Sequence, residues 1–257
     1  MKVISWNVNS IRARFNYVKE LLSTEKPDFL CLQETKIIDK EFPHKSFSEL
    51  GYFSSFYGIP SYNGVAILSK NKLINIEKIS LCNKLDARII SAKTPNFEIL
   101  SAYVPAGGDI PDPNINPKFR HKLIFLDELN ELLQKKKKII LCGDLNVAPY
   151  EDDVWSHKNL SNVVSHTEIE REKLKRILED CDLIDAVRNF INPPENIYTW
   201  WSYRSSNFRT NNRGRRLDHI WTSKEIKNKL AGCKIIDNYR SKDRPSDHVP
   251  VCLKMKY

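Results

Sequence analysis

The segment Ile139-Ile140-Leu141-Cys142-Gly143-Asp144-Leu145-Asn146 runs from an apolar stretch into a carboxylate and an amide two residues apart. A short apolar run bounded by turn residues predicts a buried strand, so Asp144 and Asn146 are expected where this strand ends. A second segment, Ser246-Asp247-His248-Val249-Pro250, places a carboxylate beside an imidazole just before the last predicted strand. Loops at strand ends commonly carry functional side chains, which makes both segments candidate parts of one site.

Polar side chains also stand at the ends of other predicted strands. Asn7 follows the first strand, Glu34 follows the strand over residues 29–33, and Asp218 opens the strand over residues 218–222. A single Asp or Asn in such a place is most often a turn residue or a helix cap, so the hypothesis of a site depends on the joint pattern. Oxygen ligands of this kind suit Mg²⁺. Together with an imidazole they indicate phosphodiester hydrolysis by an activated water.

Helical and strand patterns alternate along the whole chain. Helices are predicted over residues 12–26 and 117–134, and a capping box at Thr167 and Glu170 opens a third that runs to about residue 180. Hairpins are predicted for the ranges 52–57 with 65–69 and 88–93 with 97–104. The end of the chain alternates in a way that predicts a half-buried strand. We therefore expect an α/β fold of two packed mixed sheets with helices outside, in one domain over residues 1–257.

The composition is that of an ordinary globular protein with a basic surface. The 41 Lys and Arg against 32 Asp and Glu leave a net charge of 41 − 32 = +9, which favours a polyanionic partner such as nucleic acid or an acidic membrane surface. None of the six cysteines forms a C-x-x-C pair, so a zinc cage is not expected. We expect reduced thiols in a cytoplasmic protein instead. No signal peptide or bilayer-crossing run is visible, so no membrane association is expected.

Seven motifs then occur in a fixed order. They are Trp6-Asn7-Val8-Asn9, Leu32-Gln33-Glu34-Thr35-Lys36, Tyr103-Val104-Pro105, Gly143-Asp144-Leu145-Asn146, Tyr198-Thr199-Trp200-Trp201-Ser202-Tyr203, Arg216-Leu217-Asp218 and Ser246-Asp247-His248. The set resembles the exodeoxyribonuclease III family of abasic-site endonucleases, within the endonuclease/exonuclease/phosphatase superfamily. The motifs around Trp200 and Arg216 narrow the resemblance to this DNA-repair branch, and other segments resemble its bacterial members.

The resemblance implies a fold, an activity and partners. The fold is a four-layered α/β sandwich. The activity is Mg²⁺-dependent incision of duplex DNA 5′ to abasic sites, with removal of 3′-blocking groups and 3′-to-5′ exonuclease action as further expectations. Mn²⁺ is expected to substitute for Mg²⁺. The partner is double-stranded DNA with abasic or 3′-blocked sites, and the protein is expected to act as a monomer.

Residue roles follow from the same resemblance. Metal binding is implied for Asn7, Glu34 and Asp247. Asp144 is expected to position and deprotonate the attacking water, and Asn146 to hold a phosphate oxygen. Because an ordinary carboxylate is a weak base, Asp144 needs help from the metal or from hydrogen bonds.

The imidazole side of the site has its own expected roles. His248 is expected to bind and polarise the phosphate, oriented by Asp247, while Asp218 supports His248. Tyr103 is expected to contact the phosphate or to help the leaving oxygen. Whether Asp144 or His248 accepts the proton stays open.

Trp200 and Leu217 are the candidate wall of a pocket for the flipped-out abasic sugar, which unstacks at a lower cost than an intact nucleotide. The alternative is an aromatic core cluster of Trp200 with Trp201 and Tyr203, although strand alternation sends Trp200 and Trp201 to opposite faces.

This chain departs from animal-type members at two informative positions. Asn9 replaces an acid, which puts a second metal position in doubt. Arg215 replaces a Trp, which shifts the expected DNA grip toward Arg213 and Arg215.

Two other functions are compatible with parts of the pattern. One is another superfamily phosphoesterase that acts on a phospholipid or an inositol phosphate, and it does not need the motif around Trp200. The other is a catalytically inactive DNA-binding relative. The inactive relative would lack one of the four central side chains, yet all are present: Glu34, Asp144, Asn146 and His248.

Overall fold

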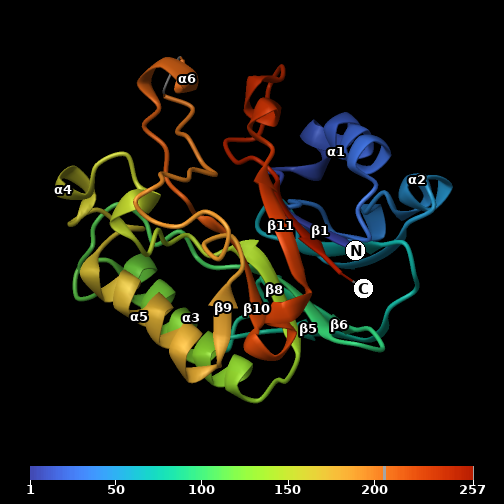
Figure 1. Cartoon of the computed structure of the whole chain (residues 1–257), viewed down its shortest axis with the longest axis horizontal. Coiled ribbons are helices and arrows are strands. Elements are labelled where there is room, and N and C mark those ends of the chain that lie inside the picture. Colours follow the sequence, from blue (N-terminus) through green and yellow to red (C-terminus); the bar gives the residue numbers. More distant parts are fainter. Residues whose placement is uncertain (205–206, 257) are drawn as a thin grey trace.

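Two six-stranded mixed sheets pack face to face between outer helices in a computed structural model that describes residues 1–204 and 207–256 (Figure 1). The first sheet has the strand order β11 (Leu230–Ile235), β12 (Val251–Met255), β1 (Lys2–Asn7), β2 (Phe29–Gln33), β4 (Val65–Ser69) and β3 (Phe53–Tyr57). The second has the order β5 (Ile74–Ile79), β6 (Ile89–Lys93), β7 (Glu98–Tyr103), β8 (Ile139–Asp144), β10 (Asp218–Ser223) and β9 (Leu183–Asp185).

Each sheet holds one parallel strand pair at its centre. β1 pairs with β2 and β7 pairs with β8, whereas the other neighbouring strands are antiparallel. Helices α1 (Ile11–Glu25) and α3 (Pro117–Gln134) provide the two crossovers. Because parallel strands leave a sheet at the same edge, the polar residues that end β1 and β2 emerge together, as do those that end β7 and β8.

The helices form the two outer layers. α1 and the short α2 (His44–Glu49) lie on the outer side of the first sheet, and α3 lies beside α5 (Glu168–Asp180) on the outer side of the second. The predicted capping box at Thr167 and Glu170 is present, and α3 begins at Pro117 as predicted. Two one-turn helices, α4 (His157–Leu160) and α6 (Phe208–Asn211), and four 3₁₀ turns, η1 (Asp39–Glu41), η2 (Glu151–Asp153), η3 (Lys224–Lys229) and η4 (Asp237–Ser241), lie in connecting segments.

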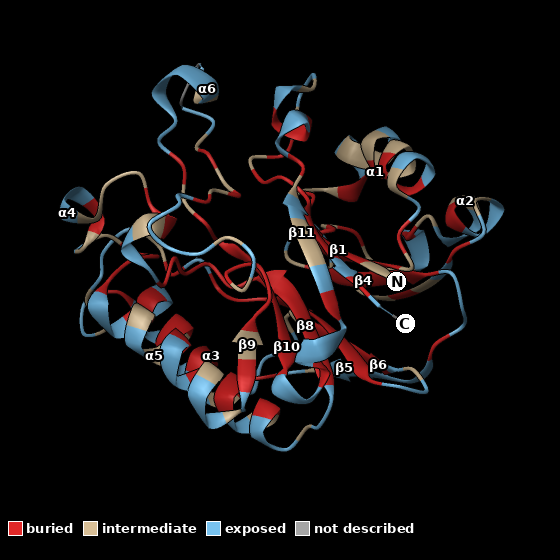
Figure 2. Ribbon diagram, in the orientation of Figure 1, coloured by how far each residue is buried: buried red, intermediate tan, exposed pale blue. Residues whose placement is uncertain are grey.

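The central core lies between the two sheets. Val3, Cys31 and Ile67 from the first sheet pack against Ile99 and Ile140 from the second, and all are fully or almost fully buried. Figure 2 shows this burial as continuous red strands flanked by helices with exposed outer faces. Strands covered on both sides need apolar residues at nearly every position, which explains why residues 29–32 and 139–142 read as unbroken apolar runs.

The structure adds strands that periodicity did not predict. β5 lies at a sheet edge with five exposed residues followed by one intermediate, so its sequence has no buried stripe. β9 has only three residues. The last strand also differs from the prediction, because Cys252 on its supposedly polar face is buried against the α1 side of the sheet.

The six cysteines are unpaired. Among the described residues, every helix is too short or too polar to cross a bilayer.

Candidate active site

Glu34, Asp144 and His248 converge at one edge of the sandwich, where strands of both sheets begin or end. One ligand atom from each lies within 4.8 Å of the others. Glu34 follows β2, Asp144 ends β8, and His248 precedes β12. Glu34 is partly exposed, whereas Asp144 and His248 are buried. The group could hold a metal ion, because carboxylate oxygens are suitable donors for a hard divalent cation. The partly exposed Glu34 opens the group to solvent.

Asn7 fixes the spacing of the two carboxylates. Its Nδ2 donates to Glu34 Oε1 at 2.9 Å and to Asp144 Oδ2 at 2.8 Å, across the two sheets. Its Oδ1 accepts from the Asn9 backbone N–H at 2.9 Å. The Asn7 oxygen accepts this one hydrogen bond and keeps a second lone pair, so metal binding by Asn7 stays a prediction. Through its Nδ2, Asn7 positions the carboxylates.

Asp218, rather than Asp247, orients His248. His248 Nδ1 lies 2.8 Å from Asp218 Oδ2, and His248 Nε2 lies 3.6 Å from Asp144 Oδ2. Asp247 accepts from Asn9 Nδ2 at 3.0 Å and from Trp200 Nε1 at 2.9 Å. The expectation that Asp247 orients His248 is therefore wrong, because Asp218 holds the imidazole and Asp247 holds Trp200. Metal binding by Asp247 stays a prediction.

Burial and neighbouring charges shift two pKa values in the cluster. Burial raises the pKa of Asp144 to about 7, assisted by the Asp218 and Glu34 carboxylates and opposed by His248 and the Asn7 amide. Burial lowers the pKa of His248, but Asp218 and Asp144 outweigh it and raise the value to about 10. At neutral pH the imidazole is therefore protonated, and Asp144 has the proton affinity that a general base needs.

Asn146 lies directly beside Asp144. Its backbone has a φ of 54°, its N–H donates to Asp144 Oδ1 at 3.0 Å, and its Nδ2 donates to Val104 O at 2.9 Å. Tyr103, which ends β7, is buried with the Arg88 guanidinium 4.9 Å from its ring centre. Burial raises the pKa of Tyr103, so the phenol keeps its proton. Both side chains therefore reach the site as expected.

A pocket of about 260 Å³ opens beside the cluster. Trp200, Leu217 and Arg215 line it together with Val164 and Ser165. The Trp200 backbone bridges to those of Arg215 and His248, which places the pocket against the imidazole.

The neighbouring aromatic and basic residues lie elsewhere. Trp201 turns away from the pocket toward Phe208, 5.3 Å between ring centres, so Trp200 and Trp201 separate as predicted. Arg213 is exposed, with its guanidinium 4.8 Å from the Trp155 ring centre, and is not a lining residue.

Several residues at the site carried little or no signal in the sequence. Val164 and Ser165 lie in a segment without periodicity or a motif, so nothing marked them. Lys122 had a signal, because a lysine there interrupts the apolar stripe of the predicted helix over residues 117–134. It is fully buried, donates to Asn146 O at 2.7 Å and pairs with Glu170 at 2.5 Å.

The sandwich and its carboxylate–imidazole cluster define a class of phosphoester hydrolases, and the sequence comparison agrees. The chain belongs to the Endonuclease/Exonuclease/phosphatase family, whose sequence model matches residues 4–248.

Within the family, the chain is similar to nucleases. It is 30% identical to exodeoxyribonuclease III of Haemophilus influenzae, over 100% of both chains. The structure of the 3′ phosphatase NExo from Neisseria, bound to a product DNA hairpin, matches with a TM-score of 0.94 and 29% identity over 100% of both chains. An AP endonuclease from Archaeoglobus fulgidus matches with a TM-score of 0.93 and 34% identity over 100% of both chains. The predicted resemblance and the predicted fold are both confirmed.

Proposed function

We propose that the protein is a Mg²⁺-dependent DNA-repair phosphodiesterase that incises duplex DNA 5′ to abasic sites and removes 3′-blocking groups, with 3′-to-5′ exonuclease action in addition. The observation that carries this proposal is the cluster of Glu34, Asp144 and His248 beside a pocket lined by Trp200 and Leu217. The names of its relatives, an exodeoxyribonuclease, an AP endonuclease and a 3′ phosphatase, support DNA as the substrate.

Glu34 would hold the cation, with Asn7 and Asp247 as further predicted ligands, and Mn²⁺ is expected to substitute for Mg²⁺. When bound, such a cation neutralises phosphate charge and stabilises charge on the leaving oxygen. Lys36 Nζ lies 2.8 Å from Glu34 Oε2 and 2.6 Å from Asn9 Oδ1. An ammonium therefore occupies that side of Glu34, which supports a single cation.

Asp144 takes the proton of the attacking water in this proposal. Its pKa of about 7 suits that role at neutral pH, whereas His248, with a pKa of about 10, is already protonated. The imidazolium donates from Nε2 to the phosphate while Asp218 holds Nδ1. Asn146 Nδ2 exchanges its 3.2 Å hydrogen bond to Asp144 Oδ2 for one to a phosphate oxygen, and Tyr103 lies beside the leaving oxygen. Fixed donors of this kind stabilise charge that develops in the transition state.

We also propose that residues 1–257 act as one catalytic domain and as a monomer, because both sheets of a single chain supply the cluster. Tyr257 itself lies outside the described residues. A cytoplasmic location agrees with the unpaired cysteines.

Three duplexes of matched sequence test the function: one with an internal abasic site, one with a 3′-phosphate and one with a recessed intact end. With Mg²⁺ or Mn²⁺ we expect cleavage 5′ to the abasic site and release of the 3′-phosphate. Excess chelator should abolish both, and added Mg²⁺ should restore them. Robust cleavage in chelator would exclude the metal role. Hydrolysis of an inositol phosphate or a phospholipid without DNA cleavage would favour the other superfamily activity, and DNA binding without any cleavage would favour the inactive relative.

A further inference from the structure

Arg215 brings a cation without an ionic partner to the pocket. Its side chain is half-buried, and its guanidinium lies 5.4 Å from the ring centre of Trp200. Its side-chain hydrogen bonds go to neutral oxygens, with Nη1 donating to Val164 O at 3.0 Å and to Ser165 Oγ at 2.6 Å. None of the ion pairs between residues 1–204 and 207–256 involves Arg215. The remaining guanidinium N–H groups are therefore available to a ligand.

Glu170, the buried acid whose charge raises the pKa of Arg215, does not neutralise this cation. Glu170 pairs with Lys122 at 2.5 Å and accepts the Ser165 N–H at 3.0 and 2.9 Å, so its charge is already matched. Burial lowers the pKa of Arg215, and Glu170 opposes that shift only in part. A partly buried cation gains free energy when an anion joins it.

The backbone holds Arg215 in place before any ligand binds. The backbones of Trp200 and Arg215 exchange two hydrogen bonds of 3.0 Å. Ser165 accepts a hydrogen bond from the guanidinium and is itself held at two points. Its N–H donates to Glu170, and its carbonyl oxygen accepts from the Ala148 N–H at 2.7 Å. Little side-chain entropy remains to be lost on binding, so the cation is preorganised.

Arg215 shares its pocket with the catalytic cluster. Glu34, Asp144 and His248 line this pocket together with Trp200, Leu217 and Arg215. In abasic-site incision and in removal of a 3′-blocking group alike, water attacks phosphorus, the bond to the 3′ oxygen breaks, and that oxygen takes up a proton. In the proposed function, the group on the other ester oxygen of the reacting phosphate lies in this pocket. It is a neutral deoxyribose at an abasic site and a carboxylate at a 3′-phosphoglycolate end.

We propose that Arg215 is a specificity-determining residue that pairs with a negatively charged group on the pocket side of the reacting phosphate, so that it favours 3′ ends bearing such a group over neutral abasic sugars. This inference rests on the proposed function. The ligand of Arg215 is a negatively charged group attached to the reacting phosphate. A contact with an ordinary backbone phosphate would act on every duplex alike.

The test compares kcat/KM for two duplexes of identical sequence, one ending in 3′-phosphoglycolate and one carrying an internal abasic site. Arg215→Met removes the charge and keeps an unbranched apolar side chain that still reaches as far as Nε. It should lower kcat/KM for the phosphoglycolate end by about ten- to a hundredfold, the value of a hydrogen bond between charged groups. The abasic duplex, whose sugar is neutral, should lose less, so the ratio of the two kcat/KM values should fall by about tenfold or more. Arg215→Lys should restore most of the difference, and thermal melting of each variant checks that it is folded.

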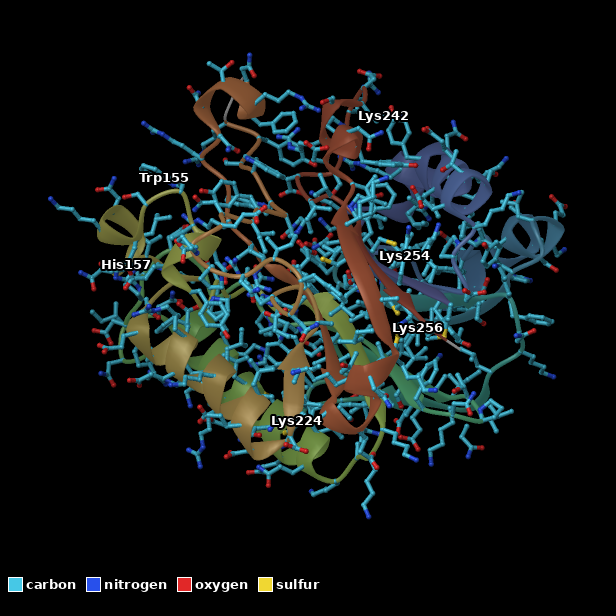
Figure 3. The ribbon with its side chains drawn as sticks, in the orientation of Figure 1. Trp155, His157, Lys224, Lys242, Lys254 and Lys256 are labelled. Atoms are coloured by element: carbon cyan, nitrogen blue, oxygen red, sulfur yellow. The ribbon has the colours of Figure 1, made fainter. Side chains whose placement is uncertain are left out.

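Arg213→Met is the matched control, because Arg213 is exposed, lies over the Trp155 ring and does not line the pocket. Figure 3 labels Trp155 on the side of the molecule that carries α4. This variant should change both substrates by the same factor. The inference is overturned if Arg215→Met changes both substrates equally, or neither. Failure of the wild-type protein to cleave either duplex would instead remove the proposed function, and this inference with it.

Discussion

At the scale of the residue, the site depends on amide and carboxylate side chains that position one another. Asn7 links Glu34 to Asp144, and Asp218 holds His248. The motifs identified these side chains but misassigned Asp247. Consecutive residues in extended backbone point to opposite sides, so Asp247 and His248 cannot easily share one task. The partner of His248 comes from a strand thirty positions away, which no local pattern reveals.

Replacing Asp144 with Asn should lower kcat by about 10²- to 10⁴-fold, because a positioned general base typically contributes that much. The affinity for an abasic duplex should change little, since the basic surface and the pocket remain. Single-turnover kinetics and a binding titration measure the two quantities. A loss of only a few fold in kcat would take Asp144 out of the proton transfer.

Replacing Asp218 with Asn should shift the pH dependence of kcat/KM. Burial lowers the pKa of His248, and Asp218 is the largest of the groups that raise it to about 10. Without that charge the imidazolium loses its proton at lower pH. The alkaline limb of the pH–rate profile should therefore move toward neutrality. An unchanged alkaline limb would mean that protonated His248 is not required.

At the scale of the element, buried polar pairs fix the loops that carry the site. Lys122 on α3 and Glu170 on α5 are both fully buried, and together they contact the segments of Asn146 and Ser165. An apolar stripe predicted α3, and a capping box predicted α5. Periodicity missed β5 because an exposed edge strand needs no stripe. It also gave no account of a lysine buried within a stripe.

Replacing Lys122 with Met should lower the free energy of unfolding by about 3–5 kcal/mol, because Glu170 would remain buried without its partner. Combining it with Glu170→Gln should cost less than the sum of the two single changes. Urea unfolding measures both. Lys173→Met is the control, since Lys173 pairs with the exposed Asp127 on the protein surface, and its loss should cost less than about 1 kcal/mol. Equal losses for Lys122→Met and Lys173→Met would contradict the argument.

At the scale of the whole molecule, the net charge of +9 spreads over several faces. Figure 3 shows Lys242 at one end of the molecule and Lys224 at the other. Long-range attraction of a polyanion therefore comes from the summed electrostatic field of all the charged side chains, to which the few cations at the site contribute only a small part. The charge was evident from composition, but its distribution depends on the fold.

Binding of an abasic duplex should weaken with salt. Between about 50 and 200 mM monovalent salt, affinity should fall at least about tenfold, the loss expected when roughly two phosphates are neutralised. Fluorescence anisotropy with the Asp144→Asn variant measures binding without cleavage. Arg213→Met should reduce the slope of log K against log salt by about one if this exposed arginine contacts a phosphate. A slope near zero would argue against phosphate contacts.

The amino-acid sequence alone indicated where several strands end and which polar groups stand there, because apolar periodicity and short motifs are local properties of the chain. Glu34, Asp144, Asn146 and His248 could therefore be identified from their motifs alone. Only the tertiary structure decided the strand order and that Asp218 rather than Asp247 holds His248. It also decided that Arg215 faces the pocket without an ionic partner among the described residues. These outcomes depend on contacts between residues far apart in the chain, and on which charges burial leaves unmatched.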